Sequence, residues 1–519
     1  MVDIYPSRRD IFRIGGSALV LNSCSSQIRA QEKTSFAVGR ITDEETGAGL
    51  SGVRVSNGRQ IVVTDLDGNF EIPFHEKVPV FVIKPSGWSL PINKTSMLPE
   101  IHTNPRNSEP VNFRLRKTAE PDTFDVIMLA DPQPGNDVEM GYLRAQIAHG
   151  PIGSTAAFGI TLGDLVGDDL SLFDRYNQVI SQIGLPWWNL PGNHDLDFSA
   201  KSASDARAPW RRVYGPTTYA FEHGPVTFVM LDNIHWNGRA TGGGLYSGRI
   251  GADNLQFVKL LLETTPKDRL IVLCMHIPLV SANDSKDPGS MTSDRDELLA
   301  LIGDRPCVSF SGHMHTTEHH YLPLPNGRVH HHHVLTALSG SWWSGPIDAM
   351  GQPIAQSCDG SPNGWHMLSI DGAAYSTRFI SSREPSQLRI MLACDADAQS
   401  ERQVRRNEAC NIAQSALGET RILVNIFDGG PRTRVEACVS GCSPSVMSRC
   451  SRPDPLAQDL FQSAGSTRKP WVRAEPSSHI WQADLPLDLR PGLHRLNVSV
   501  LNEYGRKHQG ALIFEVTEG

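Results

Sequence analysis

The segment "DVIMLADPQPG" (residues 125–135) begins as an unbroken apolar run and ends in a turn that contains two prolines. A short apolar run bounded by turn residues is typical of a buried strand. Asp131 lies where this strand ends, and Gln133 follows two residues later. The segment therefore predicts a strand that delivers a carboxylate and an amide to one edge of a sheet.

Strand and helix patterns alternate on both sides of this segment, from residue 119 to residue 385. Further apolar runs include "AFGITLGD" (157–164) and "LIVLCMHIP" (270–278), and helical patterns occupy residues 140–149, 174–184 and 254–264. Such alternation indicates an α/β domain in which helices cover the strands. Ligands of open α/β sheets bind where the strands end, so the polar residues at those ends are the candidates for function.

Polar clusters stand at five of these strand ends: "ADPQ", "GDLVGD", "GNHD", "MHIP" and "GHMH". Each cluster alone is an ordinary turn. Together they supply carboxylate, amide and imidazole groups without a thiolate, and such a set suits hard or borderline divalent metals. The series predicts a metal centre.

In their order these residues resemble the calcineurin-like metallophosphoesterases, whose motifs are D-x-H, GD-x-x-D, GNH-D/E, H and GH-x-H. The segments "GSWWSGP" (340–346) and "LPLDLRPGLHRLNVSV" (485–500) resemble an exported bacterial branch with three domains. The resemblance implies an α/β fold, a two-sheet αββα sandwich, flanked by an N-terminal transthyretin-like β-sandwich and a C-terminal β domain. It also implies a dinuclear metal-dependent phosphoric ester hydrolase.

Carried over position by position, the resemblance implies two sets of metal ligands that share Asp164. One divalent ion is held by Asp131, Gln133, Asp164 and His315, and the other by Asp164, Asn193, His276 and His313. A shared anion offsets the repulsion between two closely spaced cations. Mn, Fe and Zn all accept such ligands, so the sequence leaves the metal open.

The same resemblance implies hydrolysis of a phosphomonoester or phosphodiester by a hydroxide that bridges the metals. His194 is the expected proton donor to the leaving oxygen, because imidazole titrates near neutral pH and His194 adjoins a ligand. Asp168 or Asp195 is expected to orient it. A pyrophosphatase acting on nucleotide-sugar or lipid-linked diphosphates is the alternative, since it uses the same metals.

The residues that hold the phosphate are less well specified. The motif carboxylate expected three residues after Asp164 is replaced by Gly167, with Asp168 one position later, and the arginine that often follows it is missing. Candidates for the phosphate clamp are therefore Arg211, Arg212 and Arg239, which are otherwise surface or β-domain contacts. Trp342 and Trp343 either pack in the core or line the substrate pocket. In "HHHH" (330–333), alternate side chains face opposite ways on a strand, so at most one pair approaches the site.

Gln133 stands where the family usually has a histidine. Alone, it is explained as an amide that caps the turn before Pro134. Beside Asp131, Asp164 and His315, its amide oxygen is expected to serve as a neutral, weaker ligand. An oxygen ligand favours an oxygen-preferring ion such as Mn²⁺ at that position, or leaves it partly occupied.

Two further regions of β pattern flank the α/β region. Residues 36–118 contain short alternating segments separated by turns, which predict a small antiparallel β-sandwich, and residues 39–72 resemble the transthyretin-like, carboxypeptidase-regulatory-like modules. Residues 386–519 return to alternation and predict a second β domain, similar to the one attached to a group of bacterial calcineurin-like phosphoesterases. Residues 1–35 are expected to be a signal segment and linker.

The N-terminal segment has the arrangement of an export signal. Arg8 and Arg9 precede a short, moderately apolar stretch and small polar residues, and the segment resembles a twin-arginine signal. Cys24 could instead be a lipidation site. Both alternatives place the protein in the periplasm or outside the cell, with the twin-arginine machinery as export partner.

Cysteine placement agrees with an oxidising compartment, in which Cys394, Cys410, Cys438, Cys442 and Cys450 would be able to pair. Cys274 and Cys307 lie in apolar strand patterns and are expected to be reduced core residues.

The net charge of −8 is spread without long runs of one sign. Nothing in this distribution suggests nucleic-acid binding, and no segment outside the N-terminus is apolar enough to span a bilayer. The expected substrate is a phosphorylated small molecule or envelope component. From another class of function, an envelope glycan-binding protein with a vestigial metal site stays open.

Overall fold

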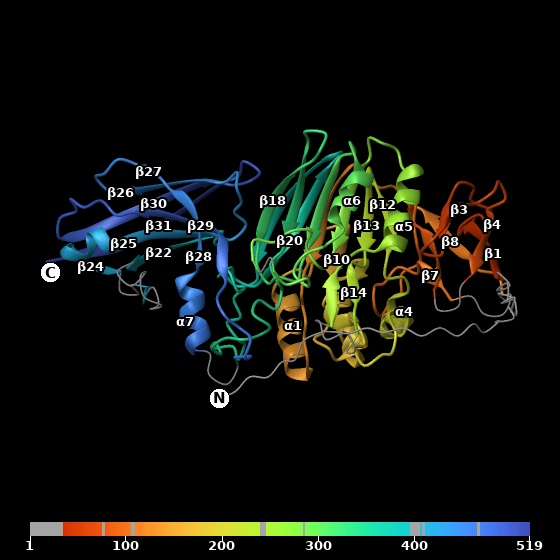
Figure 1. Cartoon of the computed structure of the whole chain (residues 1–519), viewed down its shortest axis with the longest axis horizontal. Coiled ribbons are helices and arrows are strands. Elements are labelled where there is room, and N and C mark those ends of the chain that lie inside the picture. The colour runs from red at the N-terminus through yellow and green to blue at the C-terminus, as the bar shows by residue number, and fades with distance from the viewer. Residues whose placement is uncertain are drawn as a thin grey trace, which may run out of the picture. The chain divides into compact units, whose positions relative to one another are not determined.

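The computed structural model describes residues 35–74, 78–104, 109–238, 245–283, 286–394, 405–406, 410–463 and 468–518. The predictions for Arg8, Arg9, Cys24 and Arg239 lie outside these residues. The chain is a mixed α/β structure with β domains on either side of an αββα sandwich, which confirms the predicted fold class (Figure 1). Among the described helices, none has both the length and the apolar character needed to cross a membrane.

The N-terminal β-sandwich consists of two four-stranded sheets, with the orders β4-β1-β8-β6 and β3-β2-β5-β7. The strands are β1 (Ser35–Asp43), β2 (Arg54–Ser56), β3 (Ile61–Val63), β4 (Asn69–Phe74), β5 (Val80–Ile83), β6 (Trp88–Ser89), β7 (His102–Thr103) and β8 (Phe113–Lys117). One pair, β1 with β8, is parallel, so the prediction of a purely antiparallel sandwich was wrong in this respect. The rest of the domain separates these two strands, so no tight hairpin turn forces them to be antiparallel.

A five-stranded sheet forms one layer of the central sandwich, in the order β11-β10-β9-β20-β21. Its strands are β9 (Thr123–Leu129), β10 (Phe158–Leu162), β11 (Trp187–Leu190), β20 (Gly364–Asp371) and β21 (Ala374–Ser381). β9, β10 and β11 run parallel to one another, so their carboxyl ends meet at one edge.

A six-stranded sheet forms the other layer, in the order β12-β13-β16-β17-β19-β18. Its strands are β12 (Tyr219–His223), β13 (Val226–Leu231), β16 (Leu270–Met275), β17 (Cys307–Ser311), β18 (Glu318–Pro323) and β19 (Val329–Val334). The four strands from β13 to β19 in this order are parallel. A small hairpin of β14 (Ile234–Trp236) and β15 (Tyr246–Gly248) accompanies them.

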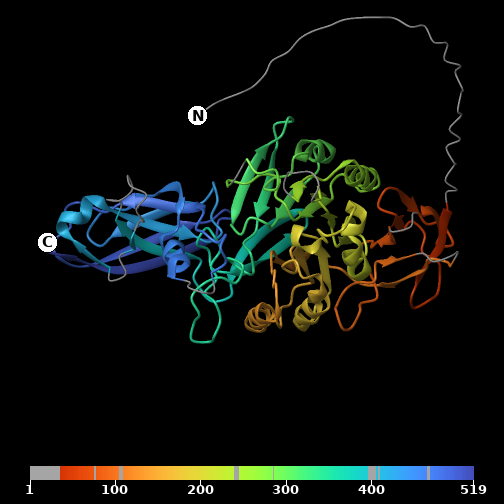
Figure 2. The same ribbon diagram turned by 60° about the horizontal axis from the view of Figure 1, so that its bottom comes forward.

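Helices cover the outer faces of both sheets (Figures 1 and 2). α1 (Asp137–His149) and α2 (Phe173–Ile180) pack on the five-stranded sheet, where Leu143 and Tyr176 share one buried cluster with Ile127. α5 (Ala252–Glu263) and α6 (Arg295–Ile302) cover the six-stranded sheet. The helices predicted at 140–149, 174–184 and 254–264 are confirmed by α1, α2 with the 3-10 turn η2 (Ser181–Ile183), and α5.

Shorter helical segments connect these elements and complete the central region. They are η1 (Leu170–Leu172), η3 (Asn193–Asp195), α3 (Ala203–Ala206) and α4 (Ala208–Tyr214). The apolar interior between the two sheets is continuous with that of the N-terminal sandwich, since Met128, Phe228 and Val55 belong to one buried cluster.

The C-terminal β domain, blue in Figures 1 and 2, also has two sheets, with the orders β23-β22-β25-β29-β28 and β24-β31-β30-β26-β27. Its elements are β22 (Leu388–Cys394), β23 (Arg405–Arg406), β24 (Asn411–Ala413), η5 (Gln414–Glu419), β25 (Thr420–Ile426), β26 (Arg434–Val439), β27 (Ser445–Val446), β28 (Ser448–Pro453), α7 (Pro455–Ser463), β29 (Pro476–Asp484), β30 (Gly492–Leu501) and β31 (Lys507–Thr517). Its core is separate from that of the sandwich.

The described cysteines with free thiols include Cys274, Cys307, Cys410, Cys438 and Cys442. Cys274 is fully buried in β16, as expected for a reduced core residue. Cys410, Cys438 and Cys442 are free as well, so these three do not pair with one another.

Candidate metal centre

Five strands of the sandwich end at the cluster of predicted metal ligands. β9 is followed by Asp131 and Gln133, β10 by Asp164, β11 by Asn193, β16 by His276, and β17 by His313 and His315. Because β9, β10 and β11 are parallel in one sheet and β16 and β17 are parallel in the other, both sets of carboxyl ends meet at the same edge of the sandwich. All seven predicted ligands are brought together there.

Half of this cluster surrounds His276. Its Nε2 atom lies 3.0 Å from Oδ1 of Asn193, 3.3 Å from Oδ2 of Asp164 and 3.2 Å from Nδ1 of His313. Ligand atoms of Asp164, His276 and His313 all lie within 4.8 Å of one another. One ion can be reached by these four side chains at once.

The other half surrounds His315. Its Nε2 atom lies 3.1 Å from Oε1 of Gln133 and 3.7 Å from Oδ1 of Asp131. The Gln133 amide nitrogen donates to Oδ2 of Asp164 at 3.2 Å. Asp164 therefore touches both halves, as the shared ligand of two metal ions must.

Backbone carbonyls fix the orientation of the two innermost imidazoles. Nδ1 of His276 lies 2.8 Å from the carbonyl oxygen of Leu162, and Nδ1 of His315 contacts the carbonyl oxygen of Gly340. Each Nδ1 is thus the protonated donor, which leaves Nε2 with a free lone pair toward the cluster. Metal-binding histidines are oriented in the same way by the partner of their other nitrogen.

The cluster is also where backbone strain accumulates. Non-glycine residues rarely adopt positive φ, yet φ is positive at Asp131 (48°), Gln133 (45°), Asp164 (51°), His313 (75°) and His315 (52°). Residues held in such conformations concentrate at functional sites, where the surrounding structure imposes them. These φ values turn the side chains from the strand ends into one space.

Three glycines make room for the ligands. A Cβ atom on Gly163 would lie 2.5 Å from Nδ1 of His276, one on Gly192 would lie 2.0 Å from Oδ1 of Asp164, and one on Gly312 would lie 2.3 Å from Oδ2 of Asp131. No side chain fits at these distances, so the "GD", "GN" and "GH" pairs of the sequence each combine a ligand with the space that a neighbouring ligand needs.

The electrostatics of the cluster suit cations. Burial, together with the nearby carboxylate of Asp164, raises the pKa of Asp131 to about 7. Burial also lowers the pKa of His313 to about 3 and that of His315 to about 4, which keeps both imidazoles neutral. Asp164 raises the pKa of His276 to about 9 although burial opposes this, so this imidazole must release its proton when a divalent ion binds, because such ions need ionised oxygen and neutral nitrogen ligands.

His194 lies beside the cluster with its ring accessible to solvent. Its Nδ1 atom is 2.8 Å from Oδ1 of Asp168, and the His194 side chain is 31% exposed. Its backbone N–H donates to Oδ1 of Asp164 at 2.9 Å. Asp164 and Asp168 raise the pKa of His194 to about 9 although burial opposes this. The ring is held at the mouth of the site by Asp168.

Asp195 does not contact His194 in the way predicted. Its carboxylate accepts hydrogen bonds from the backbone N–H groups of Gly192 (2.8 Å), Leu165 (3.1 Å) and Val166 (3.2 Å), and it is fully buried. Of the two carboxylates predicted to orient His194, Asp168 is the one that is hydrogen-bonded to its ring. Asp195 instead joins the loop after β10 to the loop after β11 and so positions Asp164 and Asn193.

Arg211 and Arg212, the two described candidates for the phosphate clamp, form no hydrogen bond or ion pair with the predicted metal ligands. Arg211 donates to the backbone oxygen and hydroxyl of Ser204, and Arg212 is exposed on α4. A cation that the sequence did not indicate is Lys469, whose Nζ lies 2.8 Å from Oε1 of Glu139. The other oxygen of Glu139 accepts from the N–H of Gly135, two residues after Gln133.

The two tryptophans of "GSWWSGP" have different roles. The Trp342 ring stacks on His315, with 3.8 Å between the centroids, and Trp471 lies next to it at 6.3 Å. Trp343 is buried, and its indole N–H donates to the carbonyl oxygen of Pro132. Trp342 therefore lines the site, while Trp343 supports the loop of Gln133 from behind.

Other aromatic residues near the ligands were missed by sequence reasoning. Tyr246 packs edge-on against His313, with 5.9 Å between ring centroids. Trp471 comes from the C-terminal domain and is 58% exposed. Neither residue lies in a motif or near a ligand in the sequence, so only the fold brings them to the site.

The histidines of "HHHH" (330–333) do not reach the cluster. His330 and His332 point one way, and both bond the hydroxyl of Ser309 at 2.7 Å. His331 and His333 point the other way, toward Tyr375 and Asp428 respectively. The alternation is as predicted, but neither pair approaches the predicted metal ligands.

Comparison with protein families identifies both flanking regions. Residues 37–118 match the family model of the N-terminal domain of calcineurin-like phosphoesterases, and residues 332–508 match that of their C-terminal domain. The second match begins inside β19 and so includes the last strands of the sandwich. Comparison with curated proteins gave no match.

Two solved structures are among those that resemble this chain. A dimetal phosphatase from Danio rerio is 12% identical, with 51% of this chain and 98% of that chain covered and a TM-score of 0.35. The purple acid phosphatase PPD1 from yellow lupin (Lupinus luteus) is 13% identical, with 64% and 72% covered and a TM-score of 0.36.

Proposed function

We propose that this calcineurin-like phosphoesterase, a metal-dependent hydrolase with both flanking domains of its family, cleaves phosphomonoester or phosphodiester bonds at the cluster around Asp164. One observation carries the proposal: side chains from five strand ends converge, with Asp164 in contact with both halves of the cluster. The identity of the metal stays open among Mn, Fe and Zn.

The ligand sets follow from the contacts. Asp131, Gln133, Asp164 and His315 would hold one divalent ion, and Asp164, Asn193, His276 and His313 the other. Ions bound there supply positive charge to the phosphoryl oxygens and lower the pKa of coordinated water. The residues of the chain have the remaining tasks of fixing the ligands, placing the substrate and moving protons.

His194 is suited to protonate the leaving oxygen. Asp168 accepts from Nδ1, so the Nε2 face of the ring is free to act as a general acid. The backbone N–H of the same residue is hydrogen-bonded to Asp164, which ties the position of the donor to that of the shared ligand. An imidazole whose pKa is raised by carboxylates carries the needed proton at neutral pH.

The test is an assay of the purified mature chain loaded with Mn²⁺, Zn²⁺ or Fe. p-Nitrophenyl phosphate and bis(p-nitrophenyl) phosphate report monoesterase and diesterase activity respectively. We expect turnover of at least one of them and a loss of about 10³-fold or more when Asp164 is replaced by Asn, because the neutral amide cannot act as the shared anionic ligand of two ions. Protein shown to hold two ions that turns over neither ester with any metal would overturn the proposal.

A second candidate is hydrolysis of a diphosphate that carries a large organic group. The observation in its favour is the aromatic surface formed by Trp342 and Trp471, which extends from His315 to the C-terminal domain. Aromatic rings bind sugar and base faces well. A panel that compares a nucleotide sugar with p-nitrophenyl phosphate decides between the two candidates by their kcat/KM.

We also propose that the protein is exported through the twin-arginine pathway and acts in the periplasm or outside the cell. The support is the order of Arg8, Arg9, a short apolar stretch and small polar residues. Lipidation at Cys24 is the alternative way for the protein to reach the envelope.

A further inference from the structure

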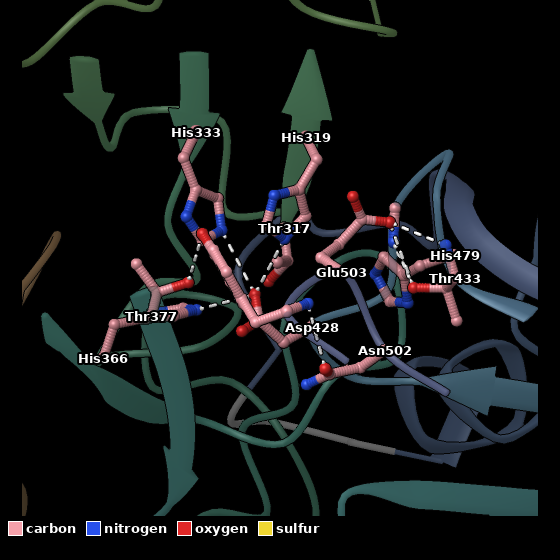
Figure 3. A network of polar contacts seen from close by, with 12 residues as sticks. Thr317, His319, His333, His366, Thr377, Asp428, Thr433, His479, Asn502 and Glu503 are labelled. Atoms are coloured by element: carbon pink, nitrogen blue, oxygen red, sulfur yellow. Dashed lines mark hydrogen bonds and ion pairs between the residues drawn. The ribbon is translucent and has the colours of Figure 1, made fainter. Parts of the chain in front are cut away.

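A second group of histidines and a carboxylate lies apart from the seven ligands, where the sandwich meets the C-terminal domain (Figure 3). Nε2 atoms of His319 and His333 each lie 3.1 Å from Oδ1 of Asp428. Nε2 of His366 lies 3.3 Å from the same oxygen. Three imidazoles therefore point at one carboxylate oxygen, and Figure 3 shows them approaching it from different elements.

These groups come from three separate sheets. His319 belongs to β18 and His333 to β19 of the six-stranded sheet, and His366 belongs to β20 of the five-stranded sheet. Asp428 follows β25 of the C-terminal domain. The histidine side chains are fully buried, and that of Asp428 is 8% exposed.

One carboxylate oxygen does not satisfy all of these rings. Three imidazole Nε2 atoms share the single Oδ1 atom of Asp428, and the Nδ1 atoms of His333 and His366 are buried without a hydrogen-bond partner. Three nitrogen atoms at nearly equal distances from one oxygen atom are arranged like ligands around a common centre.

The geometry points to a metal ion. We propose that His319, His333 and Asp428 bind a divalent cation of the zinc class, with His366 as the fourth ligand, in a structural site separate from the catalytic centre. Ligand atoms of the first three lie within 4.8 Å of one another. With bonds of about 2.0–2.1 Å, neighbouring ligands of tetrahedral zinc lie about 3.3 Å apart, close to the nitrogen–oxygen separations of this group.

His333 and Asp428 have the protonation states that a metal requires. Burial, with the neighbouring His319, lowers the pKa of His333 to about 3, so that this ring is neutral. The surrounding imidazoles hold the pKa of Asp428 well below its usual range although burial opposes this. Neutral imidazole and ionised carboxylate are the forms that bind zinc.

His319 also has the outer partner that metal-binding histidines usually have. Its Nδ1 atom lies 2.9 Å from Nε2 of His331, and Nδ1 of His331 lies 2.9 Å from the Tyr375 hydroxyl. This chain of contacts orients the His319 ring and leaves its Nε2 atom for the metal. His331 thus holds the His319 ring in place without being one of the four proposed ligands.

The location indicates a structural task. A closed, buried site with four protein ligands has no open position for a substrate, and its ligands tie both sheets of the sandwich to the C-terminal domain. His319 lies four residues after His315. An ion here would therefore anchor the segment that carries two ligands of the catalytic centre.

The first test measures metal content in full-length protein whose catalytic centre is disabled by Asp164→Ala and His313→Ala. After dialysis against zinc-free buffer, we expect about one zinc per chain by mass spectrometry of the metal. Adding His333→Gln should remove it, whereas adding His332→Gln, on the opposite face of the same strand, should not. Absence of zinc before the third substitution, or its retention after His333→Gln, would overturn the proposal.

A second measurement does not depend on the folding of the His333→Gln variant. The catalytic-centre variant is loaded with Co²⁺, and its visible spectrum is recorded. The intense bands of tetrahedral Co²⁺ are expected at about one ion per chain. A weak octahedral spectrum, or no bound cobalt, would show that the group is only a buried cluster of ionised and neutral side chains.

Discussion

The Oε1 atom of Gln133 lies 3.1 Å from Nε2 of His315, inside the cluster of predicted metal ligands. The same amide donates from its nitrogen to Asp164, and its side chain is almost completely buried. A side chain that only capped the turn before Pro134 would not need to lie among the predicted metal ligands. Gln133 therefore has the position of a ligand, and as a neutral oxygen donor it is the weakest in its half of the centre.

Replacing Gln133 with His should change which metal this half of the centre prefers. Imidazole binds zinc better than an amide oxygen does, so we expect zinc affinity at this position to rise at least tenfold relative to Mn²⁺. Competitive metal titration with isothermal calorimetry measures the change. Unchanged affinity and unchanged preference would mean that the amide does not bind a metal.

His194→Gln should reduce turnover most for esters whose leaving oxygen is strongly basic and must be protonated. General acids contribute about 10²–10⁴-fold to rate. We expect a loss of that size for alkyl phosphate esters and a much smaller one for p-nitrophenyl esters, whose leaving group is stable as an anion. Equal losses for both types of ester would show that His194 positions the substrate instead of protonating it.

Asp168→Asn is the companion change, because Asp168 holds the ring of His194 at 2.8 Å and is not itself one of the predicted metal ligands. We expect kcat for alkyl esters to fall about tenfold, with metal content unchanged, since only the orientation and charge support of the imidazole are lost. Measuring both the metal content and kcat separates this effect from damage to the centre.

The seven ligands follow five apolar strands whose ends meet at one edge of the sandwich, and the resemblance to the calcineurin-like metallophosphoesterases implied their assignment to two ions. The sequence also predicted the helices over 140–149 and 254–264 from their periodicity. Asp195 was predicted to orient His194 because the two residues are neighbours in the sequence. In the structure its carboxylate accepts hydrogen bonds from the backbone of Gly192 and Leu165, which the sequence does not reveal.

Contacts between distant parts of the chain could not be predicted from the sequence. The group around Asp428 joins residues from three sheets, and nothing at position 428 marks it as a ligand. Trp471 lies beside Trp342 for the same reason. The local pattern "HHHH" allowed only the statement that alternate rings face opposite ways, which the structure confirms.

Trp342→Ala should affect large substrates more than small ones. Its ring stacks on His315, and an aromatic contact of this kind contributes about 1 kcal/mol, or about fivefold in KM. We expect KM to rise by about this factor for an aryl diester or a nucleotide sugar. Trp471→Ala, a matched change farther from the ligands, should leave p-nitrophenyl phosphate kinetics unaltered. Equal KM values in wild type and Trp342→Ala for every substrate would contradict the proposed binding surface.

Changing Arg8 and Arg9 to Lys should keep the precursor inside the cell, because the twin-arginine pathway requires both arginines. Cell fractionation followed by immunoblotting measures this. Changing Cys24 to Ser in a separate variant tests lipidation, since a lipidated protein would then leave the membrane fraction. Normal export of the double lysine variant would contradict the twin-arginine prediction.

Glu120 joins the N-terminal sandwich to the α/β region. Its carboxylate is paired with Nζ of Lys84 at 2.6 Å and accepts from the N–H groups of Gly87 and Gly224. His223 lies 3.2 Å from it on the α/β side. Burial alone would raise the pKa of Glu120, but His223 and Lys84 lower it far below its ordinary value of 4.5.

Glu120→Gln should therefore destabilise the protein by about 3 kcal/mol at pH 7, because the buried ammonium of Lys84 loses its partner. Since the folded-state pKa of Glu120 is depressed, its stabilisation is present above about pH 4.5 and is lost as the pH falls further. The difference in the free energy of unfolding between wild type and Glu120→Gln, measured by urea denaturation, should become smaller below that pH. Glu44→Gln breaks the exposed pair with Arg116 and should cost about 0.5 kcal/mol or less. Equal costs for the two variants would show that the Glu120 contacts do not hold the domains together.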